Sequence, residues 1–118
     1  MASDLQLAIS KIGSIKISTI NAIGDLGIRA EAARRAGNDK LSSDLQLKAV
    51  ELAKKVAKLR EAEKAARRKE GLGKYIEQLD RVAKDARRSQ TKLERTEEIL
   101  KEVETFIRII VRVAKILL

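Results

Sequence analysis

The chain has 118 residues, of which 44% are hydrophobic, 36% are charged and only 2% are aromatic, and its formal net charge is +9. It contains no histidine, cysteine, proline or tryptophan, so it lacks the side chains that disulfides, most zinc sites and most nucleophile–base pairs require. Because proline breaks helices and none is present, the composition predicts an all-α protein with an aliphatic core.

The first predicted helix covers about residues 3–36. Ser3 and Gln6 have the spacing of a capping box, in which each side chain satisfies the other residue's free backbone N–H. Two arginines complement the helix dipole just before Gly37, which is well placed to end the helix as its C′ residue.

The isoleucines and glycines of this first segment recur after eleven residues: Ile9, Ile12, Gly13 and Ile17 return as Ile20, Ile23, Gly24 and Ile28. Each of the two glycines directly follows an isoleucine of the expected core stripe. An exposed glycine inside a helix would only lower the stability of that helix. We therefore expect Gly13 and Gly24 to face another helix and to permit close approach of its backbone.

The second predicted helix covers about residues 43–70, after a polar loop at residues 38–42. Ser43 and Gln46 repeat the capping-box spacing, and Gly71 ends the helical pattern. We expect the segment from Gly71 to Gly73 to reverse the chain, so that the second and third helices pack against each other as an antiparallel hairpin.

The third predicted helix covers about residues 74–118, because no glycine or proline follows Gly73. A break at residues 89–91 is the alternative, since Thr91 and Glu94 also have capping-box spacing. Apolar residues recur at intervals of three and four in all three segments. The expected fold is one helical domain spanning residues 1–118. It is an antiparallel bundle of three long helices with coiled-coil-like packing, or of four helices if the third one breaks.

Residues 106–118 are the most apolar part of the chain. At 1.5 Å per residue, an unbroken third helix would outrun its neighbours by roughly 15 Å and leave this segment in water. This segment and the apolar side of the first helix either fill the core of the chain itself, form a subunit interface or bind a membrane surface. The overhang favours a homo-oligomer, either closed or filamentous. The residues expected at the interface are Phe106, Ile107, Ile110, Val111, Val113, Ala114 and Leu117, together with Gly13 and Gly24.

The positive charge is concentrated in residues 54–95, which hold fifteen lysines and arginines against seven acidic residues. At the tip of the expected hairpin these side chains would form one basic pole. They are either a solvated helix surface or a contact for an anionic partner such as anionic lipid or nucleic acid. The residues of this predicted patch are Lys54, Lys58, Lys64, Arg67, Arg68, Arg81, Lys84, Arg87 and Arg88.

No catalytic, cofactor-binding or metal-binding residues are predicted, and no small-molecule substrate is expected. The carboxylates alternate with lysine and arginine at helical spacing, as solvated ion pairs do, and no phosphate-binding loop is present in the sequence. We therefore expect a non-enzymatic structural protein that self-assembles through long amphipathic helices. The alternatives are a membrane-active or lipid-surface-binding protein and a non-specific nucleic-acid binder. The sequence shows no signal peptide or transmembrane segment, so we expect a cytoplasmic location.

Overall fold

The computed structural model describes residues 3–118. Within that range the chain forms four α-helices and one short 3-10 helix, in the order α1 (Asp4–Arg35), α2 (Asp39–Ala66), η1 (Leu72–Tyr75), α3 (Ile76–Arg95) and α4 (Ile99–Leu117). The all-helical prediction is confirmed. The prediction of three helices is wrong, because residues 74–118 form two helices joined by a turn.

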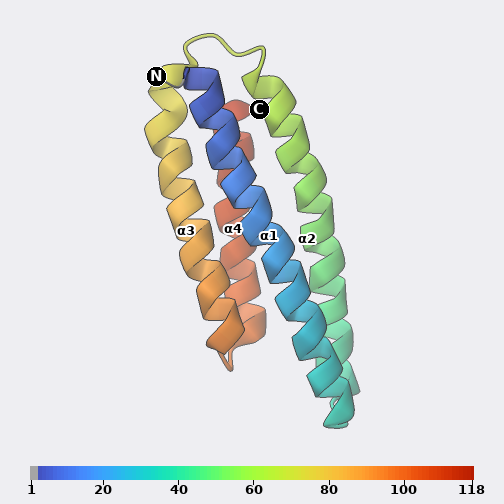
Figure 1. Ribbon diagram of the computed structural model, residues 1–118. Helices are drawn as coiled ribbons and strands as arrows, with labels where there is room; N and C mark the ends of the chain where they lie inside the picture. The colour runs from blue at the N-terminus through green and yellow to red at the C-terminus, as the bar shows by residue number, and fades with distance from the viewer. Residues whose placement is uncertain (1–2) are drawn as a thin grey trace.

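The helices form an elongated bundle of 52 × 21 × 19 Å (Figure 1). α1 packs against α2 and α3, and α4 packs against the same two helices from the other side. α2 and α3 therefore lie diagonally opposite each other, and the expected α2–α3 hairpin is wrong. The α1–α2 hairpin extends beyond the turn that joins α3 to α4, whereas the start of α1 and the end of α4 lie at the other end of the bundle.

The predicted signals at both ends of α1 are confirmed. The Ser3 backbone N–H donates to Gln6 Oε1 over 2.9 Å, and the Gln6 N–H donates to Ser3 Oγ over 3.1 Å, which completes the capping box. Gly37 has a φ of 80°, and its N–H donates to the carbonyl of Arg34. The left-handed conformation, which glycine adopts without strain, ends the helix there.

The second helix begins earlier than predicted, because Asn38 and not Ser43 caps it. The side chain of Asn38 accepts the N–H of Leu41 over 3.2 Å, so the chain turns within a few residues and α2 starts at Asp39. The predicted capping box of Ser43 and Gln46 is wrong. Both residues lie inside α2, where Gln46 donates instead to the buried side chain of Ser42.

The chain reverses between α2 and α3, as predicted, although α2 already ends at Ala66. Gly71 adopts a φ of 63°, the left-handed conformation that favours glycine. Leu72 follows it and is buried against the core, so the connection is held in place by an apolar side chain. The long connection carries the chain across the end of the bundle to the far side of α1.

A turn at Thr96 separates α3 from α4. Thr96 has extended backbone angles of −75° and 145°, and its Oγ1 accepts the N–H of Glu98 over 3.0 Å. Threonine favours such local hydrogen bonds over the interior of a helix. The considered break at residues 89–91 is wrong, since Thr91 lies within α3 and its hydroxyl donates to the carbonyl of Arg87.

The turn at Thr96 places the last segment in the core of its own chain. Phe106 and Val113 are completely buried and Ile110 is 2% exposed. They meet the inner sides of the other helices, where Ile12, Leu52 and Leu79 are also fully buried. Residues 106–118 therefore do not overhang, and the reason for placing an oligomer interface there no longer holds.

Truncating Phe106 to alanine is expected to lower the free energy of unfolding by about 3–5 kcal/mol, because it leaves a cavity in a core that has no other phenylalanine. Urea unfolding followed by circular dichroism measures this loss. Leu47→Ala is the matched control, since Leu47 is 68% exposed and should cost about 0.5 kcal/mol or less. Equal effects of the two substitutions would contradict the burial of α4.

Candidate association surface on the first helix

One side of α1 faces solvent along most of its length. We call it the outer face, and it consists of Gln6, Ser10, Gly13, Ser14, Ile17, Ile20, Asn21, Gly24, Gly27 and Ile28. From Gln6 to Gly27 its central positions recur at alternating intervals of four and three, which is the spacing of a helix contact with another helix. The face lies between the edges of α1 that pack against α2 and α3.

Three large apolar side chains on the outer face are uncovered. Ile17 is 62% exposed, Ile20 is 53% exposed and Ile28 is 70% exposed. A single exposed isoleucine is ordinary, but Ile17 and Ile20 lie one turn apart and Ile28 lies about two turns further along the same side of the helix. α1 therefore has a second apolar stripe in addition to its buried one.

The glycines of α1 lie on this outer face and not on the inner one. A Cβ atom added at Gly13, Gly24 or Gly27 would meet nothing within 4 Å. Gly13 and Gly24 therefore face no other helix of the same chain, and close approach of a helix from a second copy stays a prediction. Each glycine costs the helix about 1 kcal/mol relative to alanine, and no contact within the described residues explains that cost.

The outer face carries no charged side chain, although 36% of the chain is charged. The charged residues along its edges turn toward the neighbouring helices. Lys11 pairs with Asp80 of α3 over 2.7 Å, and Lys16 pairs with Glu63 of α2. Arg29 donates to the carbonyl of Thr96. These contacts draw charge away from the outer face and leave it neutral.

Asp25 also turns toward α3, where its carboxylate lies 3.5 Å from Gln90 Nε2. Burial raises the pKa of Asp25 above its usual value, and the hydrogen bond from Gln90 opposes that effect. The carboxylate is therefore part of the α1–α3 contact and does not add a charge to the outer face.

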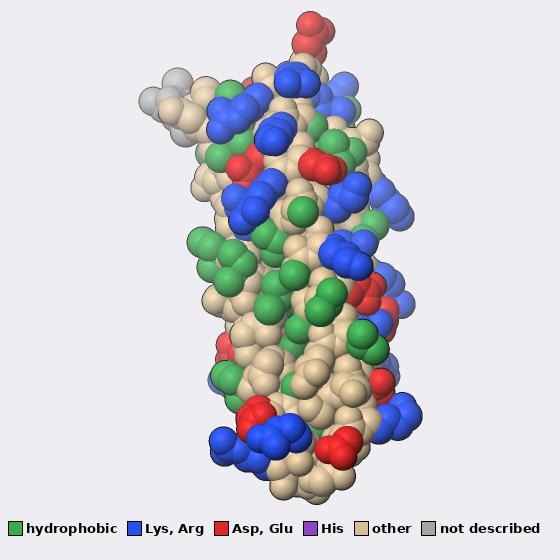
Figure 2. Space-filling view, turned by 90° about the vertical axis from the view of Figure 1, so that its right-hand side faces the viewer, with side chains coloured by type: hydrophobic (Ala, Val, Ile, Leu, Met, Phe, Trp, Pro, Cys, Tyr) green, Lys and Arg blue, Asp and Glu red, His purple; other side chains and the backbone are tan. Residues whose placement is uncertain are grey.

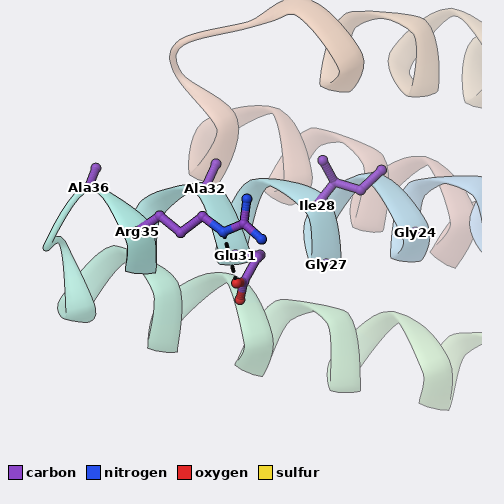
Figure 3. A pocket seen from close by; sticks show the side chains of 7 residues that line it. All are labelled: Gly24, Gly27, Ile28, Glu31, Ala32, Arg35 and Ala36. Atoms are coloured by element: carbon purple, nitrogen blue, oxygen red, sulfur yellow. Dashed lines mark hydrogen bonds and ion pairs between the residues drawn. The ribbon is translucent and has the colours of Figure 1, made fainter.

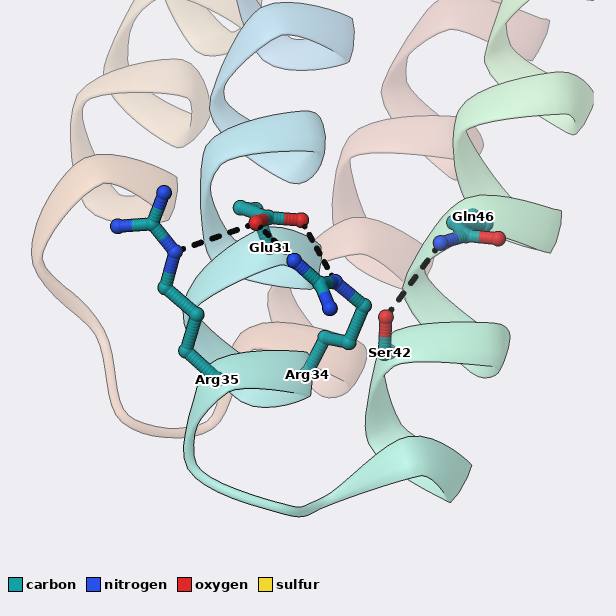
Figure 4. A network of polar contacts seen from close by, with 5 residues as sticks. All are labelled: Glu31, Arg34, Arg35, Ser42 and Gln46. Atoms are coloured by element: carbon teal, nitrogen blue, oxygen red, sulfur yellow. Dashed lines mark hydrogen bonds and ion pairs between the residues drawn. The ribbon is translucent and has the colours of Figure 1, made fainter.

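Toward the C-terminus of α1 the outer face becomes a shallow hollow (Figure 3). It exists because the two glycines have no side chains, and its lining residues are Gly24, Gly27, Ile28, Glu31, Ala32, Arg35 and Ala36. Glu31 accepts hydrogen bonds from Arg34 and Arg35 on the next turn (Figure 4). The Arg34 guanidinium holds the pKa of Glu31 below its usual value, so the helical turn that follows the outer face carries an ionised carboxylate.

The residues predicted to form an oligomer interface are placed differently. Phe106, Ile107, Ile110, Val113 and Leu117 are buried in the core, while Val111 and Ala114 are half-buried beside a small hollow between α2 and α4. Gly13 and Gly24 lie on the outer face of α1. The structure thus separates the two groups that the sequence interpretation had joined.

The predicted basic patch is divided between two helices that do not adjoin. Its members Lys54, Lys58 and Lys64 lie on α2 and Arg67 and Arg68 follow that helix, whereas Arg81, Lys84, Arg87 and Arg88 lie on α3. Figure 2 shows the α2 side, where lysine and arginine side chains gather over the upper part of the molecule.

Several of these cations are neutralised within their own helix. Lys58 pairs with Glu61 and Arg81 pairs with Glu77. The single basic pole expected at a hairpin tip is therefore wrong, because its two halves lie on opposite sides of the bundle. Contact of either half with an anionic partner stays a prediction.

Comparisons of the chain with protein-family models, with curated proteins and with solved structures found no match. None of the helices within residues 3–118 is long and apolar enough to cross a membrane.

The sequence interpretation missed Ile17, Ile20 and Ile28 as surface residues, although the signal was present. All three belong to the eleven-residue recurrence of isoleucine and glycine. On a helix, adjacent residues point about 100° apart. A glycine next to a core isoleucine therefore does not share its face, and the recurrence describes two stripes and not one.

Replacing Gly24 and Gly27 by alanine is expected to raise the free energy of unfolding of the single chain by about 0.5–1 kcal/mol each, because alanine has the higher helix propensity and its methyl group meets open space. Thermal unfolding at low protein concentration measures this gain. Gly37→Ala is the contrasting control and should lower stability, since Gly37 has a positive φ. Destabilisation by Gly24→Ala at low concentration would show that the site is not open.

The ion pair of Lys11 with Asp80 gives a pH dependence. Hydrogen bonds from Lys11 and then Lys84 lower the pKa of Asp80 from 3.8 to about 2. A lowered pKa in the folded chain stabilises it above pH about 4, and this stabilisation is lost as the pH falls from about 4 to about 2. Asp80→Asn should therefore lower the melting temperature near neutral pH and have little effect at pH about 2.

The control for this comparison is Glu77→Gln, which removes an ion pair with Arg81 within α3 and no contact between helices. Its melting temperature should stay close to that of the unaltered chain near neutral pH. A difference between Asp80→Asn and the unaltered chain that persists undiminished at pH about 2 would contradict the assignment to Asp80.

Proposed function

We propose that the protein is a non-enzymatic structural protein that self-assembles, with the outer face of α1 as its association surface. The observation that supports this best is the combination on one uncharged face of exposed isoleucines and unfilled glycines. Neither feature stabilises the single chain. Both gain a physical reason if another helix packs there, because the isoleucines are then buried and the glycines allow close approach of the backbones.

A helix fits this face better than a membrane surface does. Helices that lie on membranes bury wide apolar faces, often containing tryptophan or phenylalanine, and carry lysine and arginine on the polar side. The outer face has no aromatic residue, and its flanking cations Lys11 and Lys16 are held in ion pairs. The other segment considered for lipid binding, residues 106–118, turns its apolar side into the core.

A second copy of the chain is the partner that fits best. The same face carries both protruding isoleucines and glycines without side chains. The isoleucines of one copy can therefore pack into the space above the glycines of the other. Fully burying an isoleucine stabilises by about 1.5–3 kcal/mol. Ile17, Ile20 and Ile28 are each more than half exposed in the single chain, so a large part of that free energy is still to be gained. A self-complementary patch of this kind gives a symmetric, closed pair.

The double substitution Ile17→Glu with Ile20→Glu is expected to abolish association, because each copy would place two unpaired charges in the contact. Size-exclusion chromatography with light scattering, from low to high micromolar concentration, measures the effect. The helix content of the variant should be unchanged, since both side chains already face solvent.

Leu47→Glu is the matched control. Leu47 is 68% exposed but lies on α2, away from the outer face, so this variant should associate as the unaltered chain does. An unaltered chain that stays monomeric at high micromolar concentration would rule out the proposed function. Loss of association in the Leu47→Glu variant would place the contact on another surface.

A further inference from the structure

We infer that the helix covering the outer face is α1 of a second copy, running antiparallel about a two-fold axis at the level of Ala22. This inference rests on the proposed function and adds the direction and the register of the contact. Two observations support it. The first is how large and small residues of the outer face pair in each register, and the second is the position of the charged groups beside that face.

The contact positions along the stripe belong alternately to two sets. In an antiparallel pair of helices, each position of one set faces a position of the other set on the second helix. With the axis at Ala22, Ile17 of each copy lies opposite Gly27 of the other, and Ile20 lies opposite Gly24. Every exposed isoleucine of the central stripe then enters a notch that a missing side chain has left open. Large residues facing small ones fill the contact without crowding.

A shift by one heptad toward the N-terminus of α1 gives a neighbouring register with its axis between Ser18 and Thr19. In that register Ile17 faces Ile20, and Gly13 faces Gly24. The isoleucines would crowd at the centre while the glycine notches of both copies would meet and leave empty space. Packing therefore favours the axis at Ala22.

The charges beside the outer face favour the same register. The Arg87 guanidinium of α3 lies 3.4 Å from Ser14 Oγ, and within residues 3–118 it has no carboxylate partner in ion-pair range. With the axis at Ala22, this level of α1 faces Glu31 of the second copy. The two-fold axis repeats the contact, so two opposite-charge pairs flank the helices.

A second pair of opposite charges follows one turn further along. Asp80 of α3 lies at the edge of α1, where it pairs with Lys11 over 2.7 Å and with Lys84 over 2.9 Å. In the proposed register this level faces the turn of the second copy that carries Arg35, whose side chain is 76% exposed. In the neighbouring register the Ser14 level instead faces the uncharged positions Asn21 and Gly24. Charge complementarity therefore agrees with packing.

Dipolar electron paramagnetic resonance on single-cysteine variants tests the register, since the chain has no cysteine of its own. Ser10→Cys and Ala32→Cys are suitable, because both positions are exposed and neither contributes a large apolar side chain. At 1.5 Å per residue, the proposed register separates the two Ser10 labels by roughly 36 Å along the helix and the two Ala32 labels by roughly 30 Å.

The alternatives give different distances. The neighbouring register reverses the order, with roughly 25 Å for Ser10 and roughly 40 Å for Ala32, and a parallel pair gives short distances at both sites. Either result would overturn the inferred register while leaving self-association intact. An absence of any dipolar coupling, with light scattering showing a monomer, would overturn both this inference and the proposed function. Roughly 36 Å at Ser10 together with roughly 30 Å at Ala32 is the expected result.

Discussion

The backbone turns at Thr96, where an extended residue interrupts what would otherwise be one helix of more than 40 residues. The Thr96 hydroxyl accepts the N–H of Glu98, and Arg29 of α1 donates to the Thr96 carbonyl. These two contacts fix the turn and send α4 back along α3. Phe106 and Ile110 then reach the core, and the apolar side of α4 has no need of a partner outside the chain.

The order of the helices around the core is reinforced by one ion pair at each of the four contacts. Lys16–Glu63 joins α1 to α2, Lys11–Asp80 joins α1 to α3, and the remaining two contacts are joined by Lys48–Glu104 and Arg112–Asp85. Exposed pairs of this kind add little stability individually. They do decide where the charged side chains of α1 lie. These side chains are held along the two edges of the helix, and the solvent-facing side between the edges has none.

Much of the fold follows from local chemistry that can be read in the sequence. Ser3 and Gln6 cap α1, Gly37 and Gly71 adopt left-handed conformations, and Leu52, Leu79 and Val103 lie in the core as their spacing predicts. Such features depend on residues within one or two turns of each other. Two features depend on more distant residues and were not predicted.

The first of these is the turn at Thr96. Its stabilising contacts include one with Arg29, which lies 67 residues away. One local signal was present: Lys92 and Arg95 followed by Glu97 and Glu98 have the charge order of one helix ending and another beginning.

The second feature is the side of α1 that faces inward. Ile12 and Leu26 are buried while Ile17 and Ile28 are exposed, and only the positions of α2 and α3 decide between two stripes that are both apolar. A helix with two such stripes is held by its first set of neighbours and remains able to accept another. The three glycines on its solvent-facing side lower the stability of the single chain by about 1 kcal/mol each. Because they have no side chains, they also leave room for a second helix to approach at the same positions. Burial of the exposed isoleucines against a second helix is the gain that would offset this cost in the proposed assembly.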